Sequence, residues 1–331
     1  MPLMLEKYFD KIGIPAQFFV GLRPSVESLY FIVNKHVMAI PYQNFSLFFK
    51  EKPIDMSVSS LTERLVHQKQ GGMCYEHSEL LYHALLSLGF DVRRVPAFIL
   101  NNKPFDASMP SAHNISIVLL EKKFFLIDVG FGYNSLRYPL ALDLDKTQEI
   151  SLFKNEQYQL VHADRYVQLN VLQNNNWFSL YRMKKPFEFI DFHNTESNYH
   201  TLLQFPGCMP IRDSYIKAGM ITPQGRECFH FEPKKGTKPL AFRTTIVFGK
   251  ENTRHYDRFV DFKKDLTATL GIQPLPGSQK LLEYEALEMG PRLWGTAKKF
   301  GASTKSKPAI IFTAGLGIGA FLYDAYSKMK P

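Results

Sequence analysis

The feature that most constrains the fold is a change in hydrophobic period near residue 92. Before this point apolar residues recur at helical spacing, as they do from Ser25 to His36. After it, short runs of β-branched and aromatic residues alternate with polar turns that contain Gly or Asn. Such a change predicts a helical N-terminal segment followed by an antiparallel sheet or barrel, within an α+β chain.

Two further helices are predicted before the change of period. The tetrapeptide from Ser60 to Glu63 has the spacing of a capping box, which opens a helix. A second helix is expected to begin near Cys74, after a glycine pair, and to end at Leu88 because Gly89 favours a helix stop. Cys74 is therefore expected at a helix N-terminus.

The segments expected to form strands share apolar residues at strand spacing between polar turns. They are Val92–Leu100, Asn114–Leu120, Phe124–Val129, Val167–Gln173 and Trp177–Tyr181. A third unit, of mixed α/β type, is predicted at about residues 201 to 290. It would contain one strand, Phe242–Phe248, and two helices, Tyr256–Leu270 and Gln279–Met289.

The composition indicates a globular protein and does not favour nucleic acid as a partner. Hydrophobic residues make up 45% of the chain and charged residues 21%, which is too apolar for disorder. The formal net charge of +9 attracts anions in general. The basic residues are scattered, however, without a zinc-finger or aromatic RNA-binding signature. A phosphorylated cofactor remains open as a partner.

The cysteines and the N-terminus indicate a cytoplasmic protein. Cys74, Cys208 and Cys228 cannot all pair and do not make a disulfide framework, which favours a reducing compartment. The first residues lack the basic flank, long apolar run and cleavage site of a secretory signal.

An uncharged run from Ala309 to Tyr323 follows Pro308 near the end of the chain. As a helix it would span roughly 22 Å, which is less than the about 30 Å of bilayer hydrocarbon. Gly315 and Gly319 have the spacing that lets helices approach closely in lipid. Membrane contact through residues 309–323 and a helix packed on the protein body both remain open.

The strongest local signal of function is a glycine pair, Gly71-Gly72, shortly before Cys74 at the expected start of a helix. Helix N-terminal amides and the helix dipole stabilise a thiolate, which is the reactive form of cysteine. A cysteine nucleophile also needs a base, and the base needs a third group that orients it.

His113 and Asp128 can supply those two groups. His113 precedes the strand Asn114–Leu120, and Asp128 ends the next apolar run. A hairpin would make the two side chains cross-strand neighbours. The predicted catalytic residues are Cys74, His113 and Asp128.

A metal site is not expected. The cysteines lack paired Cys-x-x-Cys spacing, and His77 and His83 lack the four-residue offset of a helical zinc motif. Together with His67, these two histidines are expected to face solvent from their helices.

At these residues the chain resembles the arylamine N-acetyltransferase family, over most of residues 5 to 250. The segments that carry the resemblance are Ile40–Phe45, Gly71–Glu76, His113-Asn114, Asp128–Gly132, Trp177–Tyr181 and Asn198-Tyr199.

The resemblance implies a multidomain α+β fold with a papain-like Cys-His-Asp triad. A helical bundle at residues 1–90 would carry the nucleophile, and an antiparallel β-barrel at 91–200 would carry the histidine and the aspartate. An α/β lid would follow at 201–295. Residues 296–331, a basic linker and the hydrophobic tail, lie outside the resemblance.

The implied activity is transfer of an acetyl group from acetyl-coenzyme A to an arylamine, arylhydrazine or N-hydroxyarylamine, through an acetyl-cysteine in a ping-pong reaction. Such an activity belongs to xenobiotic metabolism. Phe131 would line the acceptor pocket, and no metal would take part. The same three residues also support hydrolysis or transamidation, so a cysteine hydrolase or transamidase is the alternative.

Three departures from the family pattern affect these expectations. Gln70 stands where the family usually has Arg, and Ser78 where it has Asn, which predicts that Glu76 lacks its usual partners. The stretch Thr201–Gly207 also lacks the family's serine-bearing turn. The coenzyme-binding residues therefore stay unassigned, and another short acyl-coenzyme A remains open as donor.

Overall fold

The computed structural model describes residues 5–15, 22–49, 54–106, 108, 110–163, 165–204, 214–233 and 239–272. The chain divides into two compact units, Met1–Glu285 and Ala286–Pro331, and every described residue belongs to the first. Cys208, the predicted helix Gln279–Met289 and the apolar run Ala309–Tyr323 lie outside the described residues. Within the described ranges no helix is long and apolar enough to cross a membrane.

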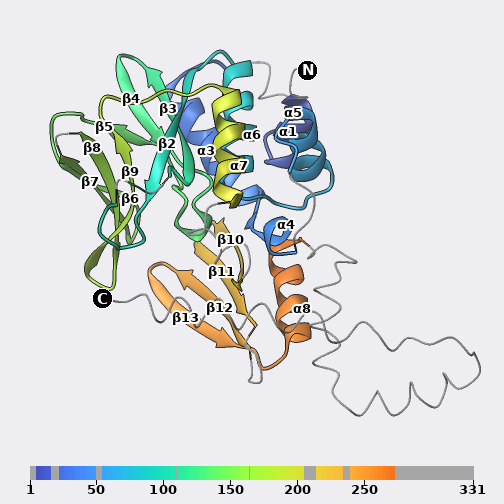
Figure 1. Ribbon diagram of the computed structural model, residues 1–331. Coiled ribbons are helices and arrows are strands. Elements are labelled where there is room, and N and C mark those ends of the chain that lie inside the picture. The colour runs from blue at the N-terminus through green and yellow to red at the C-terminus, as the bar shows by residue number, and fades with distance from the viewer. Residues whose placement is uncertain are drawn as a thin grey trace, which may run out of the picture. The chain divides into compact units, whose positions relative to one another are not determined.

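The N-terminal part of the chain is helical, as its period predicts (Figure 1). Its elements are α1 (Leu5–Lys11), α3 (Val26–Ala39), α4 (Phe45–Phe48), α5 (Val58–Leu61), the π-helical turn η1 (Thr62–His67) and α6 (Cys74–Ser87). The α3 helix is capped by Ser25, whose hydroxyl accepts a hydrogen bond from the Ser28 amide at 3.1 Å. Its apolar stripe, with Leu29, Ile32 and Val33, is buried in the core of this helical layer.

The predicted start of the helix at Ser60 was wrong. This helix, α5, begins at Val58, because the hydroxyl of Ser57 accepts a hydrogen bond from the Ser60 amide at 3.4 Å. The cap therefore lies three residues earlier in the chain than the predicted one. The start of α6 at Cys74 is confirmed.

The predicted antiparallel sheet is confirmed as eight strands that form a nearly closed barrel (Figure 1). The strand order is β5-β4-β3-β2-β9-β8-β7-β6, with β5 and β6 at the two edges. The Gln148 side chain links these edges, because its amide donates to the Ala141 carbonyl at 3.3 Å. The strands are β2 (Asp91–Ile99), β3 (His113–Leu120), β4 (Lys123–Ile127), β5 (Leu140–Leu142), β6 (Gln148–Phe153), β7 (Glu156–Ala163), β8 (Tyr166–Gln173) and β9 (Asn176–Lys184).

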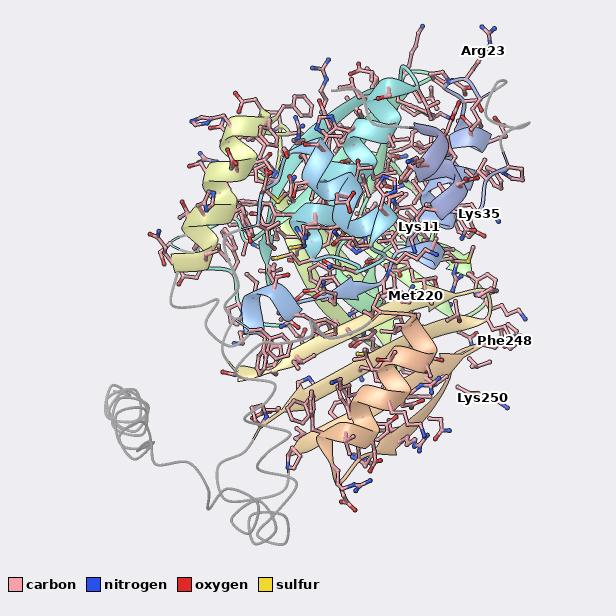
Figure 2. All side chains as sticks on the ribbon, turned by 90° about the vertical axis from the view of Figure 1, so that its right-hand side faces the viewer. Lys11, Arg23, Lys35, Met220, Phe248 and Lys250 are labelled. Carbon is pink, nitrogen blue, oxygen red and sulfur yellow. The ribbon has the colours of Figure 1, made fainter. Side chains whose placement is uncertain are left out.

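A second antiparallel sheet has the order β1-β10-β11-β12-β13. Helix α8 (Phe259–Leu270) covers one face of this sheet (Figure 2). Phe229, Phe231 and Phe262 are buried together there. The strands are β1 (Tyr42–Gln43), β10 (Ile216–Thr222), β11 (Gly225–Glu232), β12 (Leu240–Val247) and β13 (Lys250–His255). Because β1 comes from the helical segment, this sheet joins residues far apart in the sequence.

A buried ion cluster fastens the second sheet to the barrel. Glu156 of β7 pairs with Arg137 at 2.9 Å and with Arg226 of β11 at 2.7 Å. Arg137 also donates to the Thr222 carbonyl at 2.8 Å, and Arg226 to the Ser135 carbonyl at 2.9 Å. These bonds hold the short turn η2 (Gly132–Asn134), which follows β4, against β10 and β11.

Candidate active site

One pocket of about 380 Å³ contains the side chains of Cys74, His113 and Phe131. Its walls come from three parts of the fold. The start of α6 supplies Cys74, the barrel supplies Phe178, and the second sheet supplies Lys217. The predicted nucleophile and base are therefore brought into the same cavity.

Close backbone packing holds Cys74 at the pocket. Gly71 has a φ of +72°, and a Cβ there would lie 2.4 Å from the Pro41 carbonyl oxygen, so only glycine fits. A Cβ on Gly130 would lie 2.7 Å from the Cα of Cys74. The two glycines thus allow the turn before α6 and the segment after Asp128 to approach the nucleophile.

Glu76 has partners, contrary to the expectation from Gln70 and Ser78. Its buried carboxylate accepts a hydrogen bond from the Met73 amide at 3.0 Å and forms an ion pair with Arg64. Arg64 comes from the π-helical turn η1, so a residue outside the cysteine motif supplies the positive charge. The hydrogen bond from Met73 to Glu76 therefore holds the residue directly before Cys74 against the first turn of α6.

His113 and Asp128 contact each other, as the hairpin predicted. The distance from His113 Nε2 to Asp128 Oδ2 is 2.9 Å, and both side chains are buried. The β3–β4 ladder ends at the pair Ser116–Ile127, so Asp128 lies diagonally across the hairpin from His113. Since Nε2 is bonded to Asp128, Nδ1 is the ring nitrogen left for the Cys74 thiol.

The electrostatics of the site favour a charged imidazole. Burial disfavours the imidazolium, but the Asp128 carboxylate and the Cys74 thiol outweigh burial and raise the pKa of His113 to about 10. A protonated histidine beside a cysteine at a helix N-terminus stabilises the thiolate. The arrangement can therefore perform nucleophilic chemistry on a carbonyl carbon.

A model of the N-acetyltransferase family matches residues 25–227. The chain belongs to this family. It is 31% identical over 185 residues to the arylamine N-acetyltransferase of Mycolicibacterium smegmatis, a match that covers 55% of this chain and 64% of that relative. It is 24% identical over 242 residues to arylamine N-acetyltransferase 2 of Mus musculus, covering 68% and 80%. The match thus spans less than two thirds of the bacterial relative's length.

Solved structures of the family share the fold. The C70Q arylamine acetyltransferase of Mycobacterium smegmatis matches with a TM-score of 0.69 at 23% identity, covering 83% of this chain and 95% of that one. The arylamine N-acetyltransferase of Mycobacterium marinum in complex with CoA matches with a TM-score of 0.67 at 22% identity, covering 81% and 92%. The α+β architecture is therefore that of the family.

The family resemblance placed Phe131 beside the acceptor, and Phe131 does line the pocket. Its ring centroid lies 5.0 Å from that of His113 and 5.3 Å from that of Tyr181. Sequence reasoning assigned no role to Tyr181 of β9. Tyr181 is fully buried, and burial together with the Asp128 carboxylate raises the pKa of its phenol well above the ordinary value.

His77 was expected to face solvent, and that expectation was wrong. It is buried in a chain of hydrogen bonds in which His77 Nε2 lies 3.2 Å from the Pro41 carbonyl oxygen and His77 Nδ1 lies 3.1 Å from His36 Nε2. His36 Nδ1 in turn lies 2.8 Å from the Tyr8 hydroxyl. A carbonyl oxygen only accepts hydrogen bonds, so His77 Nε2 carries the proton and donates it to Pro41. His77 Nδ1 then accepts from His36 Nε2, and His36 Nδ1 accepts from the Tyr8 hydroxyl.

The second cysteine of the pocket is a poor nucleophile. Cys228 of β11 lines the same cavity as Cys74, but burial raises the pKa of its thiol to about 11. Cys228 was not among the predicted catalytic residues, and no imidazole is bonded to it among the described residues. The described ranges also contain no group of three or more His, Cys, Asp or Glu side chains arranged to hold a metal.

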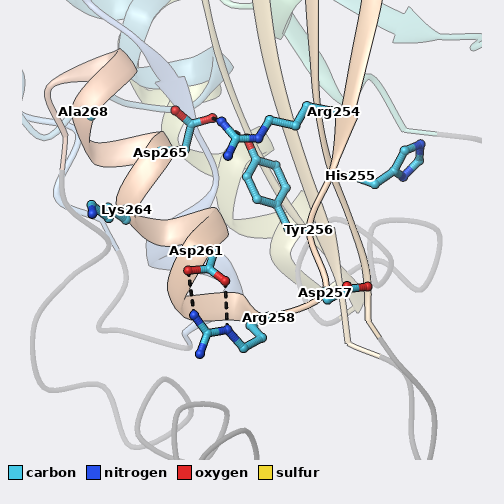
Figure 3. Close-up of a pocket in the computed structure, with 9 residues that line it drawn as sticks. All are labelled: Arg254, His255, Tyr256, Asp257, Arg258, Asp261, Lys264, Asp265 and Ala268. Atoms are coloured by element: carbon cyan, nitrogen blue, oxygen red, sulfur yellow. Dashed lines mark hydrogen bonds and ion pairs between the residues drawn. The ribbon is translucent and has the colours of Figure 1, made fainter.

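A shallower pocket of about 560 Å³ lies between β13 and α8 (Figure 3). Some of its polar groups bond to one another: Arg258 Nε lies 2.8 Å from Asp261 Oδ2, and the Tyr256 hydroxyl donates to Asp265. None of its nine lining residues is a cysteine. The candidate active site is therefore the cavity that contains Cys74.

Proposed function

We propose that this protein transfers an acetyl group from acetyl-coenzyme A to an aromatic amine or hydrazine through an acetyl-Cys74 intermediate. The observation that supports it is that buried His113, bonded to Asp128, lines one pocket with a cysteine at the start of a helix. Family membership supports acyl transfer as the reaction class.

The first half-reaction forms the acetyl-enzyme. His113 takes the thiol proton of Cys74, and the thiolate attacks the thioester carbonyl carbon. We place the tetrahedral oxyanion near the N-terminus of α6, where backbone amides can donate hydrogen bonds to it. The bond from carbon to the coenzyme sulfur then breaks, and the coenzyme leaves as a thiol after receiving the proton from His113.

The second half-reaction moves the acetyl group to the amine. The amine nitrogen attacks the acetyl carbon, and His113 accepts the proton that the nitrogen loses. The bond from carbon to the Cys74 sulfur breaks and restores the thiolate. Asp128 keeps the imidazole oriented through both steps and stabilises its charged form.

The pocket suits a flat aromatic acceptor. Phe131, Phe178 and Tyr215 line it, and aromatic rings favour offset or edge contacts with another ring. We place an arylamine, arylhydrazine or N-hydroxyarylamine among these rings. The CoA complex of the marinum structural neighbour supports a coenzyme A thioester as donor, with other short acyl chains as further candidates.

Intact-protein mass spectrometry after mixing with acetyl-coenzyme A tests the intermediate. The wild type is expected to gain one acetyl group, which an added aromatic amine removes as the N-acetyl product. Cys74→Ala should gain nothing, whereas the matched control Cys228→Ala should behave as the wild type. Acylation followed by release to water, at a rate that amines do not change, would instead support a cysteine hydrolase.

For the apolar run at residues 309–323, membrane contact remains open as an alternative to a helix packed on the protein body. Fractionation of the full chain beside a truncation after Lys307 tests it, in buffer and with liposomes. Sedimentation of the full chain alone with the liposomes supports attachment, and equal behaviour of both chains removes it.

A further inference from the structure

The second sheet contributes a charge to the pocket that the proposed mechanism does not use. Among the described residues that line the cavity, Lys217 alone is a lysine or arginine, and none is an aspartate or glutamate. A cation in a pocket whose described lining holds no carboxylate attracts an anion.

The alternation of β10 directs Lys217 toward the pocket. Ile216 and Ala218 pack in the apolar cluster under α8. Lys217 and Gly219 therefore face the opposite side of the sheet. On that side, a Cβ on Gly219 would lie 3.5 Å from the Cβ of Tyr133, another lining residue.

The backbone around Lys217 is anchored independently of its side chain. Asn44, which is 1% exposed, accepts a hydrogen bond from the Lys217 amide at 2.7 Å through Oδ1. The Asn44 amide donates to the Lys217 carbonyl at 3.2 Å, and Asn44 Nδ2 donates to the Tyr215 carbonyl at 2.9 Å. A change of the Lys217 side chain leaves all three bonds in place.

The Lys217 ammonium has no counter-charge in the described part of the chain. It lies 5.7 Å from the centroid of the Tyr215 ring and forms no ion pair with a described residue. His230, its direct partner across the β10–β11 ladder, does not compete as a cation, because burial and the charge of Lys217 lower its pKa. The ammonium is thus available to an incoming anion.

We propose that Lys217 binds an anionic group of a substrate in the active-site pocket. This inference rests on the proposed function. The group is either a carboxylate on the aromatic amine or a phosphate of the acyl donor, because an ammonium recognises both as a point charge. Lys217 would then determine specificity and take no part in bond making.

The test compares charged with neutral substrates in four proteins: wild type, Lys217→Met, Lys217→Arg and Lys250→Met. Lys250, on the outer strand β13, is an exposed lysine outside the pocket and serves as the matched control (Figure 2). In one arm, kcat/KM is measured for 4-aminobenzoate and for neutral 4-methylaniline. In the other arm, acetyl-coenzyme A is compared with S-acetyl-N-acetylcysteamine, which has no phosphate.

Lys217→Met is expected to lower the ratio of charged to neutral kcat/KM by about tenfold or more in one arm, the loss typical of a charge-assisted hydrogen bond. A loss in the amine arm identifies the anion as the carboxylate, and a loss in the donor arm identifies it as a phosphate of the acyl donor. Lys217→Arg should retain the ratio, and Lys250→Met should leave it unchanged. Unchanged ratios in both arms with Lys217→Met would overturn the proposal.

A failure of the proposed function would look different. Wild type would then form no acetyl-Cys74 with either donor. Calorimetric binding of coenzyme A and of 4-aminobenzoate to the same four proteins would still decide the role of Lys217. Weaker binding of one of these anions to Lys217→Met alone supports the role, and equal affinities overturn it.

Discussion

His113 and His77 are equally buried, each 1% exposed, but their pKa values are shifted in opposite directions. The pKa of His113 is raised to about 10, whereas that of His77 is lowered to about 4. Their partners differ. His113 contacts the Asp128 carboxylate, while His77 lies between a neutral imidazole, His36, and the Pro41 carbonyl.

The comparison separates two causes of a pKa shift. Burial lowers the pKa of any histidine, and His77 shows that effect without a bonded carboxylate to oppose it. A bonded carboxylate reverses the sign at His113. An imidazole with a raised pKa can hold the proton of a neighbouring thiol and stabilise the thiolate. The neutral His77 instead links α6 to α3 through His36. His77 ties α6 to Pro41, whose carbonyl also accepts the Gly72 amide beside the nucleophile.

The largest effect is expected from Asp128→Asn, which removes the charge that distinguishes the two histidines. Burial should then dominate at His113 and lower its pKa. Acylation of Cys74 is expected to slow by roughly a thousandfold or more, as in related triads. Rapid-quench mass spectrometry across pH measures this rate. The exposed Asp261→Asn serves as control, and a wild-type rate and pH profile in Asp128→Asn would refute the assignment.

The next effect concerns stability in acid. The folded pKa of His77 lies below its unfolded value, so the unfolded chain binds the proton more tightly. Stability should fall as the pH drops from about 6.5 toward 4, with roughly 3 kcal/mol attributable to His77. Urea unfolding at a series of pH values measures the slope.

His77→Gln sharpens this measurement, because an amide can donate and accept hydrogen bonds without titrating. Its stability should depend less on pH in that window than the stability of the wild type. The raised pKa of His113 acts in the other direction: its contribution is complete below about 6.5 and is lost as the pH rises toward 10. An unchanged acid slope in His77→Gln would disprove the buried neutral state.

A smaller effect is expected from Tyr8→Phe at the far end of the histidine chain. The substitution removes the donor to His36 Nδ1 and leaves a buried acceptor unsatisfied. This should cost about 1–3 kcal/mol of unfolding free energy, measured by urea titration at pH 7. The pH profile of acylation should stay that of the wild type, since His113 is untouched. A shifted profile would show that the two histidine sites are coupled.

The smallest effect is expected from Tyr181→Phe beside His113. The ring contacts with His113 and Phe131 persist, and only the hydroxyl near Asp128 is lost. The acylation rate should change by about fivefold or less, equivalent to about 1 kcal/mol. A loss as large as that of Asp128→Asn would make Tyr181 part of the proton-transfer machinery.

Much of the fold was predictable because it depends on local periodicity. The helix that begins at Cys74 and the hairpin that joins His113 to Asp128 follow from neighbouring residues alone. The strand β1 was not predictable, since two residues of the helical segment form it only by pairing with Gly219 and Ala218. The π-helical turn that contains Arg64 was likewise not predictable, because the hydrophobic periodicity of the sequence does not distinguish it from an α-helix.

The sequence by itself determined the family, the position of Cys74 at a helix start and the approach of His113 to Asp128. These features rest on spacing within one element or one hairpin. Only the tertiary structure decided that Arg64 pairs with Glu76, that His77 is buried against His36 and that Lys217 lines the same pocket as Cys74. Each of these depends on partners brought together from distant segments, and the electrostatic effect of a buried group is set by those partners.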